Sequence, residues 1–352
     1  MLLEGLQLPL TTPFYPDGRL NLVKLEHNVA RYSKTPVAGL AVLSDCGEPT
    51  MLSDDETRQV LRSVADSAAA GKVLIAAVSR DSVSGTLELA EYATTSGYDA
   101  VLVKTPSVFR DGAQDGRTKE LLTYFRAVAD HSPLPVVLCS GAQRRGDWLP
   151  TEMVIELSGH SQIIGLVDGA TTRERVEAIT EGTHSVKHDV TVTAVFAAVT
   201  RRMQAKKIAA AGELIAAQSL TAGGAALTVA PTTGAKTRTK TLGFQILAGS
   251  AAEMLEALRT GAIGAMPAFA GAAPQACYEV LAAWKDGDER LAQEKQARLR
   301  LVAELMEGLG VAGIKFGSDL NGYFGGSCRL PLLPLTGEQR TAVETLLQGL
   351  RH

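Results

Sequence analysis

The stretch IIGLVDGATTRERVEAIT, Ile163–Thr180, contains the unit from which we predict the whole fold. Its first six residues form a nearly continuous apolar run of strand length, which is typical of a parallel strand buried on both faces. Thr171 and Glu174 then form a capping box, which predicts the start of a helix. The unit is therefore a buried strand that is followed by a helix.

The same unit recurs along the chain, and Ser53 with Glu56 forms a second capping box. Seven further apolar runs alternate with helical patterns: LQLPL (6–10), AGLAVLS (38–44), KVLIAAVS (72–79), AVLVKTP (100–106), PVVLCS (135–140), FQILAG (244–249) and GAIGAMPA (261–268). Eight strands separated by helices predict an α/β protein of the (β/α)₈ TIM-barrel type. A doubly wound open sheet is the alternative, but no G-x-G-x-x-G follows the first strand.

The spacing between the sixth and seventh strands predicts an insertion over about 183–243. The sixth helix should end near Gly182, whereas the next strand begins near Phe244, and ordinary connections have about 2–6 residues. An insertion at this point emerges at the amino-terminal face of a barrel. It contains an alternating run, HDVTVTAVFAAV (188–199), and a helix-like run, RRMQAKKIAAAGELIAAQ (201–218). The apolar row of the alternating run needs a cover, either from a partner subunit or from the chain's own barrel.

About three helical patterns follow the eighth strand and end with GEQRTAVETLLQGL (337–350). We therefore predict a barrel over residues 1–270, interrupted by the insertion, and a C-terminal helical extension over 271–352.

Composition excludes several classes of protein. The 352 residues are 45% hydrophobic and 21% charged, and a net charge of −3 argues against a nucleic-acid-binding surface. No run approaches the roughly 18 apolar residues that a membrane helix requires, and the start has no leader pattern, so we expect a cytoplasmic protein. The four cysteines lie far apart without a C-x-x-C pair, which is typical of reduced thiols. We expect no cofactor and no metal; the pair His184 and His188 lacks a third ligand and falls on the face opposite to the predicted strand ends, so we interpret it as surface.

Several blocks resemble, in order, the dihydrodipicolinate synthase and N-acetylneuraminate lyase family. They are LPLTTPFYPDG, AGLAVLSDCGEPTMLSDDE, VKTPSVF, LPVVLCSGAQRRG, IIGLVDGA, QILAGSAAEMLEALRTGAIGAM and GSCRLPLLPL. The resemblance implies a barrel with a C-terminal helical extension that acts as a class I aldolase on pyruvate and related 2-oxo acids. It also implies a homo-oligomer, either a dimer or a tetramer, and a small oxo-acid or sugar-acid ligand.

The residues that the family uses for its chemistry are replaced in this sequence. The resemblance implies a Schiff-base lysine at Val167, a proton-relaying tyrosine at Cys139 and a pair of carboxylate-binding threonines at Asp45 and Cys46. Arg144 keeps the position of the family's later arginine. No lysine lies between Lys119 and Lys187, so a shifted alignment does not restore the amine. We therefore do not expect ordinary pyruvate aldolase activity.

Polar residues nevertheless gather at the predicted strand ends, where a barrel's pocket is built. The candidate catalytic residues are Cys139, Asp45 and Asp168. The candidate substrate-binding residues are Ser44, Cys46, Thr105, Ser107, Arg144 and Ser250. Lys104 alternates onto the same side of its strand as Leu102 and is the one lysine placed to replace the missing amine, although a structural role is the simpler interpretation.

Three interpretations of this pocket remain open. Cys139 or Cys46 could act as a nucleophile, although no histidine falls near a strand end to serve as its base. Asp45, Asp168 and a thiolate could bind a divalent metal ion that polarises a carbonyl group. Alternatively the pocket is degenerate, and the protein is a catalytically inactive binding or assembly protein.

Overall fold

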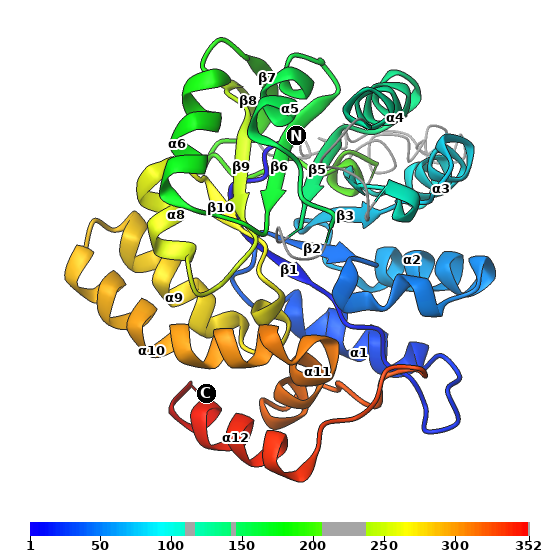
Figure 1. Cartoon of the computed structure of the whole chain (residues 1–352), viewed down its shortest axis with the longest axis vertical. Coiled ribbons are helices and arrows are strands. Elements are labelled where there is room, and N and C mark those ends of the chain that lie inside the picture. Colours follow the sequence, from blue (N-terminus) through cyan, green and yellow to red (C-terminus); the bar gives the residue numbers. More distant parts are fainter. Residues whose placement is uncertain (110–116, 142–145, 206–236, 351–352) are drawn as a thin grey trace, which may run out of the picture.

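The computed structural model describes residues 1–109, 117–141, 146–205 and 237–350. Eight parallel strands close into a barrel in the order β1-β10-β9-β6-β5-β4-β3-β2 (Figure 1). They are β1 (Gly5–Pro9), β2 (Gly39–Val42), β3 (Val73–Ala77), β4 (Ala100–Lys104), β5 (Val136–Ser140), β6 (Ile163–Asp168), β9 (Gln245–Ala248) and β10 (Gly264–Ala265). The predicted (β/α)₈ barrel is confirmed and the open-sheet alternative is wrong.

Helices alternate with the strands and surround the barrel (Figure 1). They are α1 (Leu22–Tyr32), α2 (Asp54–Ser67), α3 (Val83–Thr95), α4 (Thr118–His131), α5 (Thr151–Ser158), α6 (Arg173–Gly182) and α8 (Met254–Thr260). The predicted capping box is present at the start of α2, where Glu56 N donates to Ser53 Oγ (3.2 Å) and Ser53 N donates to Glu56 (3.0 Å). This box fixes where α2 begins.

The start of α6 differs from the prediction by one residue. Thr172, not Thr171, is the N-cap, because its side chain accepts a hydrogen bond from Arg175 N at 3.3 Å. Thr171 instead turns back and donates its hydroxyl to the carbonyl oxygen of Asp168. The predicted capping box with Glu174 is therefore wrong, although the helix itself is confirmed.

Apolar side chains pack in two layers, one inside the barrel and one between the strands and the helices. The inner layer includes Ile75, Leu102 and Leu247. In β4, Val101 and Val103 belong to the outer layer, whereas Leu102 belongs to the inner one. Since side chains alternate along a strand, Lys104 shares the side of Leu102, and the structure shows that this side faces the barrel interior.

The insertion contains an antiparallel pair of strands, β7 (His188–Thr193) and β8 (Thr237–Leu242). Val190 and Val192 of β7 are buried and pack with Leu2, and Leu242 lies against the same cluster. The first part of the apolar row, Val190 and Val192, is therefore covered by the chain itself, whereas Val195 and Phe196 further along the run are exposed. Most of the predicted helix-like run, from residue 206 on, lies outside the described residues.

The segment that follows β7 lies against the amino-terminal side of the barrel strands. Arg202 donates hydrogen bonds to the carbonyl oxygens of Ala68 (2.8 Å) and Lys72 (2.6 Å), between α2 and β3. Arg201 N donates to Asp99 Oδ1 (2.6 Å), just before β4. These contacts place this part of the insertion on the face opposite to the strand ends that carry the candidate site.

Four helices follow β10 in the part of the chain that the structure describes, rather than about three. They are α9 (Pro274–Lys285), α10 (Glu289–Gly308), α11 (Gly310–Leu320) and α12 (Gly337–Leu347). The extra break separates α10 from α11 at Gly310, whose φ of +68° is a conformation that favours glycine. Helix α11 contacts the turn η1 (Asp45–Gly47) that follows β2. The C-terminal helices therefore reach the carboxyl ends of the strands.

Candidate active site

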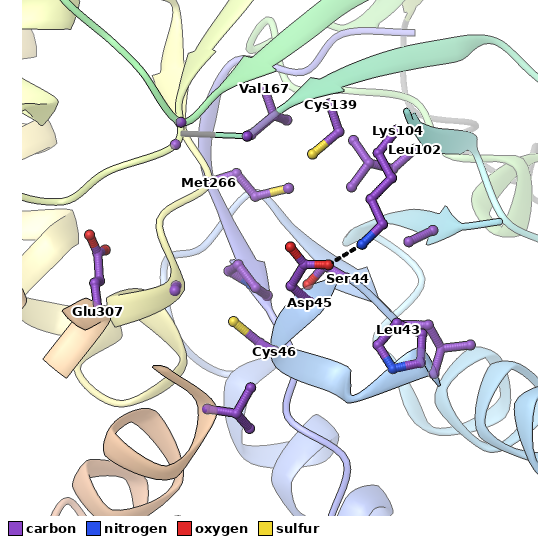
Figure 2. A pocket seen from close by; sticks show the side chains of 18 of the residues that line it. Leu43, Ser44, Asp45, Cys46, Leu102, Lys104, Cys139, Val167, Met266 and Glu307 are labelled. Carbon is purple, nitrogen blue, oxygen red and sulfur yellow. Dashed lines mark hydrogen bonds and ion pairs between the residues drawn. The ribbon is translucent and has the colours of Figure 1, made fainter. Parts of the chain in front are cut away.

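A cavity of about 290 Å³ lies at the carboxyl ends of the barrel strands (Figure 2). This is the face on which barrel enzymes carry their catalytic residues. Its polar lining includes Ser44, Asp45, Cys46, Lys104, Cys139, Ser140, Ser250 and Glu307. Its apolar lining includes Ala77, Leu102, Val167 and Met266. The cavity is a largely apolar basin with a few polar groups, as small-molecule sites usually are.

Lys104, Cys139 and Val167 form one row across three neighbouring strands. Lys104 of β4 pairs with Cys139 of β5, and Cys139 pairs with Val167 of β6. All three residues line the cavity. The lysine of this chain therefore lies in the same row as the position where the family resemblance implied an amine, two strands away.

The Lys104 amine lies against a carboxylate. Lys104 Nζ donates a hydrogen bond to Asp45 Oδ1, and the two groups form an ion pair. The Lys104 side chain is 19% exposed, whereas that of Asp45 is 49% exposed and reaches the cavity from η1 (Figure 2). Lys104 is the one lysine among the described residues that line this cavity. The pair places an amine and a proton acceptor in direct contact.

Cys139 lies on the strand next to that of Lys104, and its thiol is influenced by the charges of both Lys104 and Asp45. Burial raises the pKa of its thiol to about 12, with Asp45 contributing in the same direction and Lys104 opposing. The thiol is therefore protonated near neutral pH, and the thiolate that nucleophilic catalysis requires is disfavoured. Cys46, Cys139, Cys277 and Cys328 are all thiols in the structure.

Asp168 does not line the cavity, although the sequence analysis placed it among the catalytic candidates. Its side chain is fully buried, at 0% exposure, and pairs with Arg175 of α6 at 2.9 Å. Arg175 also donates to the carbonyl oxygen of Leu149 (2.8 Å) and to Ser140 Oγ (3.3 Å). The carboxylate therefore belongs to a network behind the cavity wall that joins the ends of β5 and β6 to α6.

Two of the predicted substrate-binding residues, Thr105 and Ser107, do not line the cavity. Thr105 lies on the side of the chain opposite to Lys104 and is buried outside the cavity. Ser107 donates both its backbone N–H and its hydroxyl to Asp81 at 2.6 Å and does not line the cavity. Arg144 lies outside the described residues. Ser44, Cys46 and Ser250 do line the cavity.

Glu307 of α10 is a lining residue that sequence reasoning missed. It accepts hydrogen bonds from Ser250 Oγ (3.1 Å) and from Ala251 N (3.2 Å), just after β9. A single glutamate in a charged amphipathic helix carries no local signal of such a role. The position of α10 is what brings it there.

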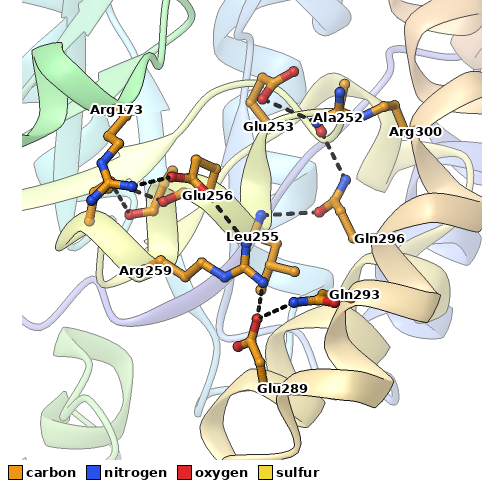
Figure 3. A network of polar contacts seen from close by, with 12 residues as sticks. Arg173, Ala252, Glu253, Leu255, Glu256, Arg259, Glu289, Gln293, Gln296 and Arg300 are labelled. Carbon is orange, nitrogen blue, oxygen red and sulfur yellow. Dashed lines mark hydrogen bonds and ion pairs between the residues drawn. The ribbon is translucent and has the colours of Figure 1, made fainter.

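A polar network fixes α10 against the segment between β9 and the end of α8 (Figure 3). Gln296 accepts from Leu255 N (3.0 Å) and donates to Ala251 O (3.0 Å), and Arg259 of α8 pairs with Glu289. The amide of Gln296 is buried, so its hydrogen bonds are well shielded from water. The helical extension is thus attached at defined points and completes one wall of the cavity.

The turn that carries Asp45 is held from two sides. Thr12 Oγ1 donates to Gly47 O at 2.7 Å from the loop that follows β1. Glu48 accepts a hydrogen bond from Arg329 N (2.9 Å) and pairs with Lys315 of α11. The position of Asp45 therefore depends on contacts from both ends of the chain.

In the part of the chain that the structure describes, His, Cys, Asp and Glu side chains form no group of three or more that could hold a metal ion. Asp168 does not join Asp45 and the cavity thiols to form a metal site, because its carboxylate pairs with Arg175. Among the described residues, none of the helices is both long and apolar enough to span a lipid bilayer.

The fold and the cavity define a (β/α)₈ barrel whose C-terminal helices complete a small-molecule site at the strand ends. The sequence matches the dihydrodipicolinate synthetase family over residues 2–196 and 231–350, and the chain belongs to this family. It is 26% identical over 345 residues to a 4-hydroxy-tetrahydrodipicolinate synthase of Methanothrix thermoacetophila, covering 98% of this chain and 96% of that protein.

A second relative is the L-threo-3-deoxy-hexylosonate aldolase of Aspergillus niger, which is 25% identical over 348 residues, covering 96% of this chain and 92% of that protein. Among solved structures, a dihydrodipicolinate synthase of Bacillus anthracis superposes with a TM-score of 0.77 at 20% identity, covering 100% of both chains. At that identity the superposition supports the fold and nothing more.

Proposed function

We propose that this protein is a carbon–carbon lyase that acts on a small 2-oxo acid or sugar acid in the strand-end cavity. The observation that carries the proposal is the contact between the Lys104 amine and the Asp45 carboxylate inside that cavity. Cleavage of the bond between the carbons α and β to a carbonyl group requires a group that withdraws electrons from the carbonyl and a base that removes the proton of the β-hydroxyl group. The pair supplies a cation and a base side by side.

The size and lining of the cavity support a ligand of this class. A cavity of about 290 Å³ is at the lower end of the range for small-molecule sites and suits a short oxo acid or sugar acid. Ser44 and Ser250 offer hydroxyl groups along its wall, whereas Ser140 turns its hydroxyl to Arg175 behind it. The names of the two relatives, a synthase and a sugar-acid aldolase, belong to the same general class of reaction.

The ordinary pyruvate aldolase mechanism of the family receives no support at position 167. The side chain there is a valine, and the neighbouring position in the row is the protonated thiol of Cys139. A thiol with a pKa of about 12 is a poor nucleophile and a poor proton relay near neutral pH. A metal-assisted route is also less well supported, because Asp168 binds Arg175 behind the cavity wall.

A panel of 3-deoxy-2-oxo sugar acids of different chain length tests the proposal. The full chain should release pyruvate from at least one of them, detected with lactate dehydrogenase and NADH. Asp45→Asn should lower kcat by about 10²-fold or more, since it removes a base. Lys119→Arg, a change on the exposed start of α4, is the matched control and should leave the rate unchanged. Saturable binding of a sugar acid by calorimetry without any turnover would instead identify a non-catalytic binding protein.

A further inference from the structure

We infer that Lys104 is the residue that forms an imine with the substrate carbonyl, and that Asp45 carries the protons of this step. The inference rests on the proposed function and names the residues that would perform it. It assigns to β4 a role that the family resemblance places on β6, at position 167.

The strand register of the barrel allows a lysine on β4 to take the place of a lysine on β6. Lys104 and Val167 are separated by one strand in a single row. Neighbouring strands lie about 4.8 Å apart, so the two backbone positions are roughly 10 Å apart around the wall. Both side chains line the same cavity, and a lysine side chain is long enough to reach its middle from either strand. An amine on β4 can therefore meet a carbonyl group that an amine on β6 would also meet.

The charges of Asp45 and Lys104 compensate each other. An isolated aspartate at position 45 would repel a substrate carboxylate, and an isolated buried lysine would bind it as a simple counter-ion. In this chain the two charges neutralise each other through a direct hydrogen bond. The cavity can then admit an acid whose carbonyl carbon faces Nζ. Leu102, Val167 and Met266 give the amine an apolar floor that limits its contact with water.

The step balances without any further reagent. Asp45 accepts one proton from the Lys104 ammonium, and the Nζ lone pair attacks the carbonyl carbon while the π electrons move to oxygen. That oxygen takes up one proton from the attached nitrogen and one from Asp45 and leaves as water, which gives the protonated imine and returns Asp45 to its carboxylate form. The bond between the carbons α and β to the imine then breaks as the Asp45 carboxylate removes the proton of the β-hydroxyl group, which releases an aldehyde. The bonding electrons enter the imine to give an enamine, whose protonation and hydrolysis return a 2-oxo acid and the free amine.

Borohydride trapping tests the assignment on the full chain. The protein is incubated with pyruvate, and separately with 2-oxobutanoate, in the presence of sodium borohydride, and is analysed by intact mass and peptide mapping. We expect one adduct for each chain, on the peptide that contains Lys104. Lys104→Arg should abolish the adduct, while the exposed-site control Lys119→Arg should retain it. Circular dichroism verifies that each variant is folded.

The role of Asp45 has its own readout. Asp45→Asn should slow trapping by about 10²-fold, and Asp45→Glu should restore most of the rate, because a carboxylate within reach is what the step requires. An adduct on another lysine, an adduct that persists in Lys104→Arg, or no adduct with either oxo acid would overturn the inference. An adduct at Lys104 without turnover of any sugar acid supports the inference and contradicts the proposed lyase function. Turnover of a sugar acid that borohydride does not inhibit would support the proposed lyase function and contradict the inference.

Discussion

Lys315 and Glu48 form an ion pair in which both side chains are removed from water, at 1% and 0% exposure. The pair joins α11 to the turn that carries Asp45. Lys315 Nζ also donates to Ser327 O at 2.9 Å and lies 4.5 Å from the centroid of the Phe14 ring. Burial lowers the pKa of Lys315, and Glu48 acts in the opposite direction. A C-terminal helix therefore helps to set the position of a turn at the mouth of the barrel.

Removing one member of this pair should be more damaging than removing both. We expect Lys315→Met to lower the free energy of unfolding by about 3–5 kcal/mol, because it leaves the Glu48 carboxylate buried without its cation. The double variant Glu48→Gln, Lys315→Met should lose less, since neither charge remains. Urea denaturation followed by circular dichroism measures both. Arg62→Met, which breaks an exposed pair with Asp66, is the control and should cost less than about 1 kcal/mol. A single variant as stable as the double variant would contradict this account.

Asp168 should behave as a structural residue and not as a metal ligand. Asp168→Asn leaves the Arg175 guanidinium buried without its partner, so we expect a loss of about 3–5 kcal/mol in the free energy of unfolding. Treatment of the parent protein with EDTA should not change the yield of borohydride adduct, because the Lys104 and Asp45 pair needs no metal ion. Loss of the adduct on chelation, with recovery on addition of a divalent cation, would restore the metal-assisted interpretation.

Because the pKa of the Cys139 thiol is raised, we expect the free energy of unfolding to fall at alkaline pH. Its folded-state pKa, about 12, lies above the ordinary value of 9.0, so the folded protein keeps a proton that the unfolded chain releases. The stabilisation is therefore fully present below about pH 9 and is lost as the pH rises from about 9 towards about 12. Each such thiol adds a slope of at most about 1.4 kcal/mol per pH unit in this window.

Cys139→Ser should remove that part of the slope in urea denaturation series at increasing pH. The pKa values of Cys277 and Cys328 are also raised by burial, so a decline remains in both proteins and only the difference between them reports on Cys139. Identical slopes for parent and variant would mean that the Cys139 thiol ionises normally. At neutral pH we also expect iodoacetamide to label Cys139 much more slowly than a cysteine in a peptide.

The insertion should contribute to the stability of its own barrel. Arg202 donates to carbonyl oxygens at the end of α2, and Arg202→Met leaves these groups without that partner, so we expect a loss of about 1–3 kcal/mol. The neighbouring Arg201, whose side chain is exposed, supplies the matched control Arg201→Met. Light scattering should give a dimer or a tetramer for the parent and for both variants. If Arg202→Met changed the oligomeric state without lowering the stability, the insertion would instead serve assembly.

The barrel was predictable because each of its units is encoded locally. The run Ile163–Asp168 and its seven counterparts are apolar over strand length, and helical periodicity lies between them, so a few neighbouring residues decide each element. The length of the insertion followed from the same rhythm. The alternation of side chains along β4 placed Lys104 on the same side as Leu102, but the closure of the barrel decided that this side is the inner one. Small errors at the ends of elements, such as Thr171 for Thr172, arise because two adjacent threonines can each serve as a cap.

Partners distant in sequence were decided by the tertiary structure alone. Asp45 and Lys104 are 59 residues apart, and their contact requires the turn after β2 to approach the end of β4 across the barrel mouth. Asp168 ends a strand like a catalytic carboxylate, but α6 brings Arg175 against it and removes it from the cavity. Glu307 reaches the site because α10 is attached beside β9. Local sequence determines which way a side chain leaves its own strand or helix, whereas its ionic and hydrogen-bonding partners depend on how those elements pack, and no short-range pattern encodes that.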